Sequence, residues 1–341
     1  MLGIAQGVLG IAPESFLLGD GGVARAYGTF GRPNSFAGYL ELSVFPVAWV
    51  VVGLLPELRR RWDAWQDVRP RGFLASSAER CAWGLATLLV IVLAGSAGVM
   101  LGGIALSFSR GAWVGVAVGV LISASLWFRR WIPLVLAALP LLLLLALLVG
   151  SRVLPASVAD RTSSILDEVR PFDASSITIT EDNFATVERM AHWQAGWRMW
   201  KSAPLTGIGP GNFNERYPDY FVRNEFRFSQ GHAHNIYIHL LAETGLIGLL
   251  CYVAGIVALI VGGVIAALRV ADPVWRAAAT GAVGTMSAAA MHQMFEHLHV
   301  LNLGITMAIS WAIVIIALRQ PQHSVARDTH GATRGVEYSR A

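Results

Sequence analysis

Long apolar runs separated by short polar segments dominate this chain. Six runs approach the roughly 20 apolar residues that a membrane-spanning helix needs, at 34–55, 81–107, 111–128, 131–149, 245–268 and 300–318. A seventh run, 277–296, is weaker but still apolar. Residues 1–12 are too few to span and end at Pro13, so we expect the chain to begin partway through a helix. The pattern predicts an all-α integral membrane protein with about seven transmembrane helices.

The arginines of the connecting segments predict the orientation of these helices. They fall in alternate connections, at Arg59, Arg60, Arg61, Arg69, Arg71, Arg80, Arg129, Arg130, Arg269, Arg276 and Arg319. Because short cytoplasmic loops are rich in Lys and Arg, we expect this side to be cytoplasmic. The opposite side then carries residues 13–33 and one long loop. The predicted organisation is N-terminal transmembrane helices (1–149), a periplasmic loop domain (150–233), C-terminal transmembrane helices (234–319) and a disordered cytoplasmic tail (320–341).

Composition agrees with the membrane class. The chain is 55% hydrophobic and 14% charged, whereas soluble domains carry about 25% charged residues. A net charge of +4, evenly spread, does not indicate nucleic-acid binding. Cys81 and Cys251 both lie in apolar runs, so we expect packing residues and no disulfide framework.

Within the long loop, residues 186–200 show helical periodicity. Met190, Trp193, Trp197 and Trp200 fall on one stripe of such a helix. A tryptophan stripe suits a helix lying among lipid headgroups, and it equally suits a helix packed on the protein's own surface. The following PLTGIGPGNF (204–213) is a turn segment, and its glycines do not fit a nucleotide-binding loop.

The segment GHAHNIYIHLLAETGLIG (231–248) enters the fifth apolar run. If it is helical from residue 235, Asn235, His239 and Glu243 form a polar stripe at spacings of four. Polar groups at membrane depth usually face a bundle interior, and for His239 and Glu243 a structural pairing is favoured over chemistry. His234 precedes this helix at the outer interface, where a neutral imidazole could accept a proton.

Two groups of histidines are candidate metal sites. His232, His234 and His239 do not match zinc spacings, and no Cys or acidic partner is placed to complete a site. His292, His297 and His299, with Glu296, are expected to form a wet interfacial patch at an outer helix end. We therefore expect no metal and no other cofactor.

Three arginines lie on the predicted outer side: Arg32, Arg110 and Arg189. Guanidinium groups grip phosphate oxygens bidentately, so several at one membrane face would suit a lipid diphosphate. Taken singly, each is better explained as an interfacial anchor.

Four motifs in order resemble the O-antigen ligase and polymerase superfamily. They are GTFGRPNSFAGYL (28–40), SFSRGAW (107–113), ERMAHWQAGWRMWKSAPLTGIGPGNF (188–213) and HAHNIYIHLLAETGLIG (232–248). The chain departs from the family at Arg32, where Asn is frequent, and it lacks several N-terminal spans that members usually have.

The resemblance implies a metal-independent membrane glycosyltransferase in a bacterial cytoplasmic membrane, a part of lipopolysaccharide and cell-envelope biosynthesis. Its donor would be a glycan on undecaprenyl diphosphate, and its acceptor lipid A-core or another lipid or saccharide. By the resemblance, His234 is the general base, and Arg110 and Arg189 bind the diphosphate. Arg32, Asn235 and Glu243 are further candidates for substrate binding.

Two other functions remain open at this point. A surface-polysaccharide polymerase of the same family would differ only in its acceptor. A transporter of bicarbonate or another small solute should show paired broken helices or inverted repeats near the membrane midplane, and the sequence shows neither.

Overall fold

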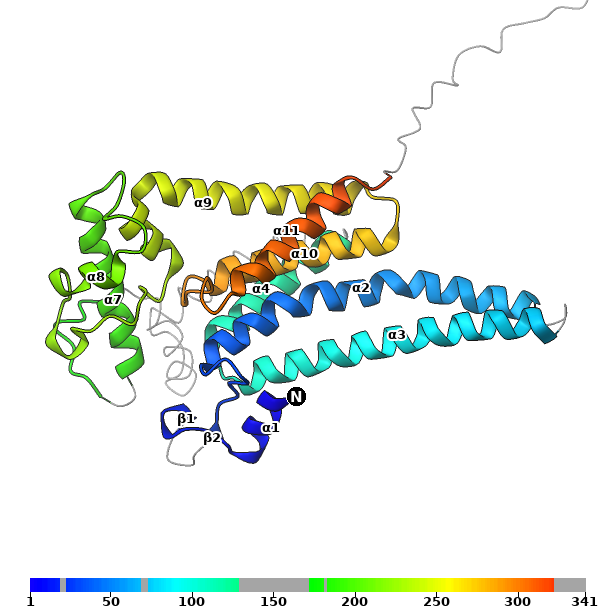
Figure 1. Cartoon of the computed structure of the whole chain (residues 1–341), viewed down its shortest axis with the longest axis horizontal. Helices are drawn as coiled ribbons and strands as arrows, with labels where there is room; N and C mark the ends of the chain where they lie inside the picture. Colours follow the sequence, from blue (N-terminus) through cyan, green and yellow to red (C-terminus); the bar gives the residue numbers. More distant parts are fainter. Residues whose placement is uncertain (19–22, 69–72, 129–171, 181–182, 322–341) are drawn as a thin grey trace, which may run out of the picture.

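The protein is a bundle of long helices with a smaller helical subdomain at one end (Figure 1). The structure, a computed structural model, describes residues 1–18, 23–68, 73–128, 172–180 and 183–321. Its longer helices are α2 (Pro33–Val68), α3 (Phe73–Leu106), α4 (Arg110–Trp127), α7 (Phe184–Ser202), α9 (Ile236–Arg269), α10 (Pro273–His292) and α11 (Leu303–Leu318). Four of them, α2, α3, α4 and α9, are long and apolar enough to cross a membrane, and α11 is apolar but shorter. The chain is therefore a mostly helical, multi-pass membrane protein.

Helix α10 is the buried centre of the bundle. It packs against α2, α4, α9 and α11, and its residues from Ala277 to Ala289 are all buried. Ala, Gly, Ser and Thr fill most of these positions, and small residues let helix backbones approach closely where no hydrophobic effect drives association. This packing explains why the run 277–296 is weak in hydropathy, since a helix surrounded by protein need not match lipid.

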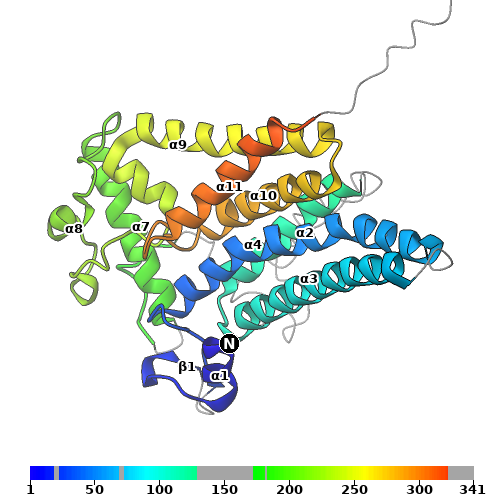
Figure 2. The same ribbon diagram turned by 45° about the vertical axis from the view of Figure 1, so that its right-hand side comes forward.

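One end of the bundle gathers the starts of α2, α4, α9 and α11 and the ends of α3 and α10, beside α7 (Figures 1 and 2). We call it the α7 end. Arg269, Arg276 and Arg319 lie at the opposite end. The alternation of ends agrees with the predicted arrangement of the described spans. The run 131–149, Arg129, Arg130, the first part of the loop (150–171) and the tail from 322 lie outside the described residues.

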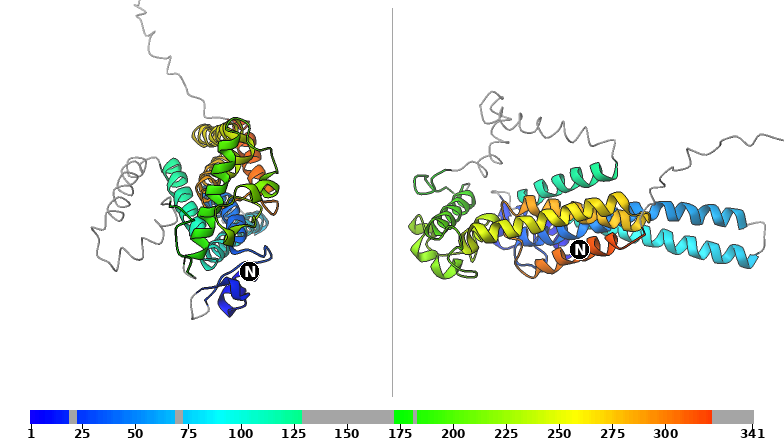
Figure 3. Two further views of the ribbon diagram at one scale, coloured as in Figure 1. Left: turned by 90° about the vertical axis from the view of Figure 1, so that its left-hand side faces the viewer. Right: turned by 90° about the horizontal axis from the view of Figure 1, so that it is seen from above.

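The expected basic loop between the first two spans is largely helical. α2 continues to Val68 and α3 begins at Phe73, so the two helices extend past the rest of the bundle as a hairpin (Figure 3). Trp62, Trp65 and Trp83 cluster along it, with the rings of Trp62 and Trp83 4.9 Å apart. Turn-forming residues were few in this stretch, and helix-favouring Glu, Leu, Arg and Ala carry the helix onward.

Helix α9 is broken at Gly245, whose φ of 64° and ψ of −165° are not helical. The segment 204–209 fills the break with its backbone. The N–H groups of Ile208 and Gly209 donate to the carbonyls of Ala242 and Glu243, each at 2.9 Å. The N–H of Leu246 donates to the carbonyl of Pro204 at 2.9 Å, and that of Ile247 to Leu205 at 3.2 Å. The break thus leaves these backbone groups satisfied, as burial at membrane depth demands.

Two glycines make this exchange possible. A Cβ on Gly207 would lie 2.3 Å from the carbonyl carbon of Glu243, and one on Gly245 would lie 2.3 Å from that of Leu205. Both residues also have positive φ, of 68° and 64°, which only glycine adopts without cost. The TGIG motif (206–209) and the TGLIG motif (244–248) therefore pack backbone against backbone, and we call this contact the Gly207–Gly245 junction.

The subdomain at the α7 end is built on α7. Its predicted helical stretch 186–200 lies within Phe184–Ser202. The face that carries Ala195 and Met199 is buried against α9 and against Phe213 and Tyr217. Met190 is buried in a second cluster with Val187 and Phe226, and Trp193 packs against that cluster. Trp197 is 44% exposed and pairs with Trp200 at 4.5 Å between ring centroids. The helix is thus packed on the protein's own surface, and the edge that carries Trp197 is exposed.

The first residues form a small cap beside the N-terminal end of α2. They comprise α1 (Leu2–Leu9), η1 (Glu14–Phe16) and an antiparallel pair, β1 (Leu17–Leu18) and β2 (Val23–Ala24). Gln6 holds the chain before α2 through both atoms of its amide. Its Nε2 donates to the carbonyl of Gly28 at 3.2 Å, and its Oε1 accepts from the Gly28 N–H at 2.8 Å.

Candidate active site at the α7 end

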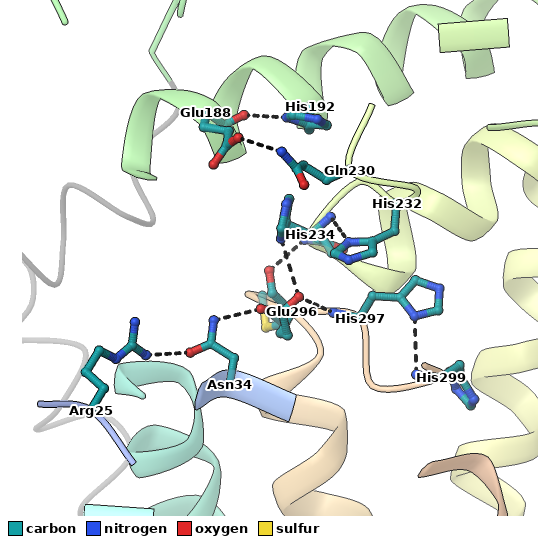
Figure 4. Close-up of polar contacts among 12 residues, drawn as sticks. Arg25, Asn34, Glu188, His192, Gln230, His232, His234, Glu296, His297 and His299 are labelled. Atoms are coloured by element: carbon teal, nitrogen blue, oxygen red, sulfur yellow. Dashed lines mark hydrogen bonds and ion pairs between the residues drawn. The ribbon is translucent and has the colours of Figure 1, made fainter. Parts of the chain in front are cut away.

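The most distinctive polar contact in the molecule joins His234 to Glu296 (Figure 4). His234 immediately precedes the N-cap of α9, and Glu296 follows the end of α10. His234 Nδ1 lies 3.3 Å from Glu296 Oε1. A carboxylate only accepts hydrogen bonds, so the imidazole carries its proton on Nδ1 and presents a lone pair on Nε2. Among the described residues, the buried Nε2 has no hydrogen-bond partner. This is the arrangement of a general base with an acidic orienting group.

The backbone holds His234 in a fixed and costly conformation. Its φ is 52°, in the left-handed region that non-glycine residues rarely adopt and that is often found at functional sites. Its N–H donates to His232 Nδ1 at 3.1 Å. Asn235 caps α9 by accepting from the N–H groups of Tyr237 and Ile238, and its Nδ2 donates to the carbonyl of Met294 at 2.9 Å. The start of α9 is thereby tied to the segment that carries Glu296.

Glu296 is held as an anion. Burial by itself would raise the pKa of Glu296, but the hydrogen bond from His234, electrostatic interactions with His234 and His232, and the charge of Arg189 hold this pKa well below its usual value. Two more donors bind the carboxylate, Asn34 Nδ2 at 2.8 Å and the N–H of His297 at 3.1 Å. A fixed negative charge thus stands beside the imidazole and would stabilise its protonated form.

Other histidines around this pair are kept neutral. Burial lowers the pKa of His232 and of His297 to about 3, and it lowers the pKa of His192 to about 4. The ring of His192 stands edge-on to that of His234, with centroids 5.5 Å apart. At neutral pH these three side chains therefore add no charge to the site.

Three of the four residues expected to form a wet patch at the end of α10 are buried, which corrects the prediction for them, whereas His299 is exposed. The exposed fractions of His292, Glu296 and His297 are 1%, 7% and 8%. His292 Nδ1 pairs with Glu41 Oε2 of α2 at 2.5 Å, inside the bundle. Glycines of α4 allow this pair to pack closely, since a Cβ on Gly111 would meet the His292 ring. The pair fastens the end of α10, and hence Glu296, to α2. A lone acid in an apolar run was the signal that could have marked Glu41 in advance.

A third arginine joins Arg110 and Arg189 at the site. Arg110 is the first residue of α4 and is exposed, and Arg189 lies half-buried on α7. Arg25 follows β2, and its pKa is lowered to about 10, first by burial and then by the charges of Arg189 and Arg110. Arg25 therefore keeps its positive charge at neutral pH. Arg32, also predicted at this face, is exposed and lies just before α2.

Two residues named for substrate binding are occupied by structural contacts. The carboxylate of Glu243 accepts from the N–H groups of Gly211 and Phe213, both at 2.9 Å, and His239 Nε2 lies 3.6 Å from it. The expected structural pairing of His239 and Glu243 is thus present, and it anchors the turn segment 204–213. The side chain of Asn235 is likewise occupied, because it caps α9 by accepting from the N–H groups of Tyr237 and Ile238.

His232, His234 and Glu296 could also be considered as metal ligands, because their ligand atoms lie within 4.8 Å of one another. The acidic partner missing from the sequence motif is supplied by Glu296. Ligands of a tetrahedral zinc lie about 3.4 Å apart, so these side chains would have to draw together. His232 Nδ1 and Glu296 would also exchange their present hydrogen bonds for the metal. The residues therefore fit a metal poorly in this arrangement.

Comparison with known proteins identifies the region that carries most of this site. Residues 95–253 match the family described as O-Antigen ligase. The match includes Arg110, Arg189, His234 and the Gly207–Gly245 junction, whereas Arg25 and Glu296 lie outside it. A search of curated proteins found no match. Residues 95–253 are therefore similar to the O-antigen ligase family, and this family implies a membrane glycosyltransferase of the ligase or polymerase type.

Proposed function

We propose that this protein transfers a glycan from undecaprenyl diphosphate to an acceptor hydroxyl at the periplasmic face of a bacterial cytoplasmic membrane. The observation that carries the proposal is the His234–Glu296 pair with its free Nε2 atom, set beside Arg110 and Arg189. A base and a group of cations within one site suit the two ends of such a reaction, a hydroxyl that loses a proton and a diphosphate that leaves.

The reaction would proceed by displacement at the anomeric carbon of the donor. The acceptor oxygen bonds to that carbon while the bond from the carbon to the diphosphate oxygen breaks, and the diphosphate leaves with the bonding electrons. His234 Nε2 takes the hydroxyl proton, and Glu296 stabilises the resulting imidazolium. General-base catalysis of this kind contributes roughly 10²- to 10⁴-fold in rate.

Arg110 and Arg189 would hold the diphosphate and stabilise the charge that develops on it. Arginine suits this role because its planar fork binds two phosphate oxygens at once. The donor is already activated by its diphosphate, so the reaction needs no nucleotide. Neither a metal nor another cofactor has a part in this mechanism.

The membrane arrangement follows from the same assignment. The α7 end would face the periplasm, with the loop domain 150–233 above the spans of 1–149 and 234–319. The tail 320–341 would then be cytoplasmic. Including α10, α11 and the run 131–149, the chain would cross the membrane about seven times. The arginine-rich opposite end supports this orientation.

Acceptor choice separates a ligase, which would use lipid A-core, from a polymerase, which would use another glycan chain. A transporter is less well supported. α9 is broken, but near the α7 end, and the segment 204–209 fills the break with protein backbone. Among the described helices no second broken helix pairs with it, as transporter sites usually require.

The proposal is tested in cells that lack their own ligase. Supplying this chain should produce glycan-modified lipid, whereas His234→Ala should insert equally well but leave the glycan on undecaprenyl diphosphate. Arg216→Gln, which removes an exposed charge paired with Asp219 in the same subdomain, serves as the control. Wild-type levels of transfer by His234→Ala would rule out the role given to His234.

A further inference from the structure

Arg25 connects the segment before α2 to the turn between α3 and α4. Its Nε donates to the carbonyl of Ser107 at 2.9 Å, and its Nη2 donates to Asn34 Oδ1, also at 2.9 Å. Ser107 lies three residues before Arg110. Figure 4 shows the guanidinium turned toward Asn34. The contact with Ser107 holds it near the start of α4, where Arg110 lies.

Asn34 links Arg25 to Glu296, the residue that pairs with His234. Because its Oδ1 accepts from Arg25, its Nδ2 is turned toward Glu296 and donates to Oε2 at 2.8 Å. The other carboxylate oxygen of Glu296 faces His234. Arg25, Asn34, Glu296 and His234 therefore form one hydrogen-bonded chain, although they come from three separate parts of the sequence.

The charged residues around Arg25 indicate what its guanidinium group would bind. Arg110 and Arg189 are close enough to lower its pKa, and Glu296 is the acid that acts on it in the opposite direction. An anion placed among these three guanidinium groups would interact favourably with each of them. Guanidinium forks match phosphate oxygens, and a diphosphate offers enough of them for three arginines.

We propose that Arg25 is a third diphosphate-binding arginine and that Asn34 links it to the Glu296–His234 pair. The inference rests on the proposed function and deepens it. Donor binding would fix Arg25, Arg25 holds the amide of Asn34, and Asn34 holds the carboxylate that orients the base. Binding of the donor and orientation of the base are thus coupled through four side chains.

The first test measures binding alone. Undecaprenyl diphosphate is titrated onto the purified full chain in detergent, with undecaprenol as the uncharged comparison. Arg25→Gln should weaken diphosphate binding at least tenfold, Arg25→Lys should fall between, and Arg216→Gln should bind like the wild type. Wild-type affinity in Arg25→Gln would overturn the assignment. Because no transfer is measured, this result stands whether or not the proposed function holds.

The second test measures the link through Asn34. Asn34→Ala should lower kcat about tenfold and leave the donor KM within twofold, while the exposed Asn214→Ala serves as the control. The double variant Arg25→Gln/Asn34→Ala should show no lower kcat than Arg25→Gln, since both changes break the same chain. A purely structural role would instead lower the melting temperature and change kcat and KM together. Unchanged kcat in Asn34→Ala, or additive losses in the double variant, would overturn the link.

Discussion

His234 and Glu296 are 62 positions apart in the chain, yet Nδ1 of one lies 3.3 Å from Oε1 of the other. The contact forms because the entry of α9 and the exit of α10 meet at the same end of the bundle. The N–H of Ile236 donates to the carbonyl of Gln293 at 3.0 Å and holds the two segments together. The pair gives His234 both its tautomer and its orientation.

Glu296→Gln should keep the shape of the side chain but remove the charge that stabilises the protonated base. We expect kcat for glycan transfer to fall about 100-fold, with the donor KM changed less than twofold. Steady-state kinetics in proteoliposomes checks this. Glu225→Gln, at an exposed acid paired with Arg223, should behave as the wild type, and an unaltered kcat in Glu296→Gln would remove Glu296 from the mechanism.

Arg189→Lys should raise the donor KM by about tenfold. The positive charge is retained, but a lysine ammonium does not reproduce the bidentate grip on phosphate. Kinetics at varied donor concentration checks this, with Arg198→Lys on the exposed side of the same helix as the control. If the donor KM of Arg189→Lys stays at the wild-type value, Arg189 is an interfacial anchor instead.

The sequence was most informative where a signal is local. The helix at 186–200, the placement of His234 before α9, and the spans of α2, α3, α4 and α9 all follow from spacing and hydropathy within a few turns. The role of Glu243 was also foreseen as structural, although its partners, the N–H groups of Gly211 and Phe213, were not.

Contacts between distant segments could not be read in this way. Glu296 was assigned to a wet patch because its nearest neighbours in sequence are histidines at a helix end. Only the packing of α10 against α2 and α9 buries it. Arg25 was not among the predicted site residues, since nothing in the sequence indicates that the chain before α2 folds back onto Ser107.

Gly245→Ala and Gly207→Ala should each destabilise the protein by at least about 2 kcal/mol. Each new Cβ would meet backbone at 2.3 Å, and each residue has a positive φ. Thermal unfolding in detergent measures the effect. Gly98→Ala in α3 is the matched control, because a Cβ there has nothing within 4 Å and alanine favours a helix. Equal melting temperatures for Gly245→Ala and Gly98→Ala would contradict the junction.

Acidification should destabilise the α7 end. The pKa of His232 and His297 is about 3 and that of His192 about 4 in the folded protein, against 6.5 as the ordinary value. Between the folded and the unfolded pKa values, the unfolded chain binds more protons than the folded protein. The free energy of unfolding therefore falls as the pH drops below 6.5. Each histidine contributes about 2 kcal/mol of this loss by pH 5. The lowered pKa of Glu296 acts in the same direction below about 4.5.

Thermal unfolding between pH 7 and pH 5 checks this dependence. His192→Gln should flatten it, because the variant has one group fewer to protonate. A melting temperature that is independent of pH over this range would show that these histidines are not kept neutral by folding.

Chelation should leave the transfer rate unchanged. The mechanism needs the lone pair of His234 Nε2, and His232, His234 and Glu296 fit a metal poorly. Transfer assays with and without EDTA measure the effect. Loss of activity on chelation, restored by metal, would favour a metal-assisted reaction.

The role of His234 as the base of a glycan transfer is tested with purified protein. Wild type, His234→Ala and Arg216→Gln are reconstituted in liposomes with an undecaprenyl-diphosphate-linked glycan and an acceptor, and the first turnover is followed. We expect equal first-turnover rates for wild type and Arg216→Gln. The rate for His234→Ala should be at least about 100-fold lower, although this variant still binds the donor. Transfer by His234→Ala at the wild-type rate would contradict this role.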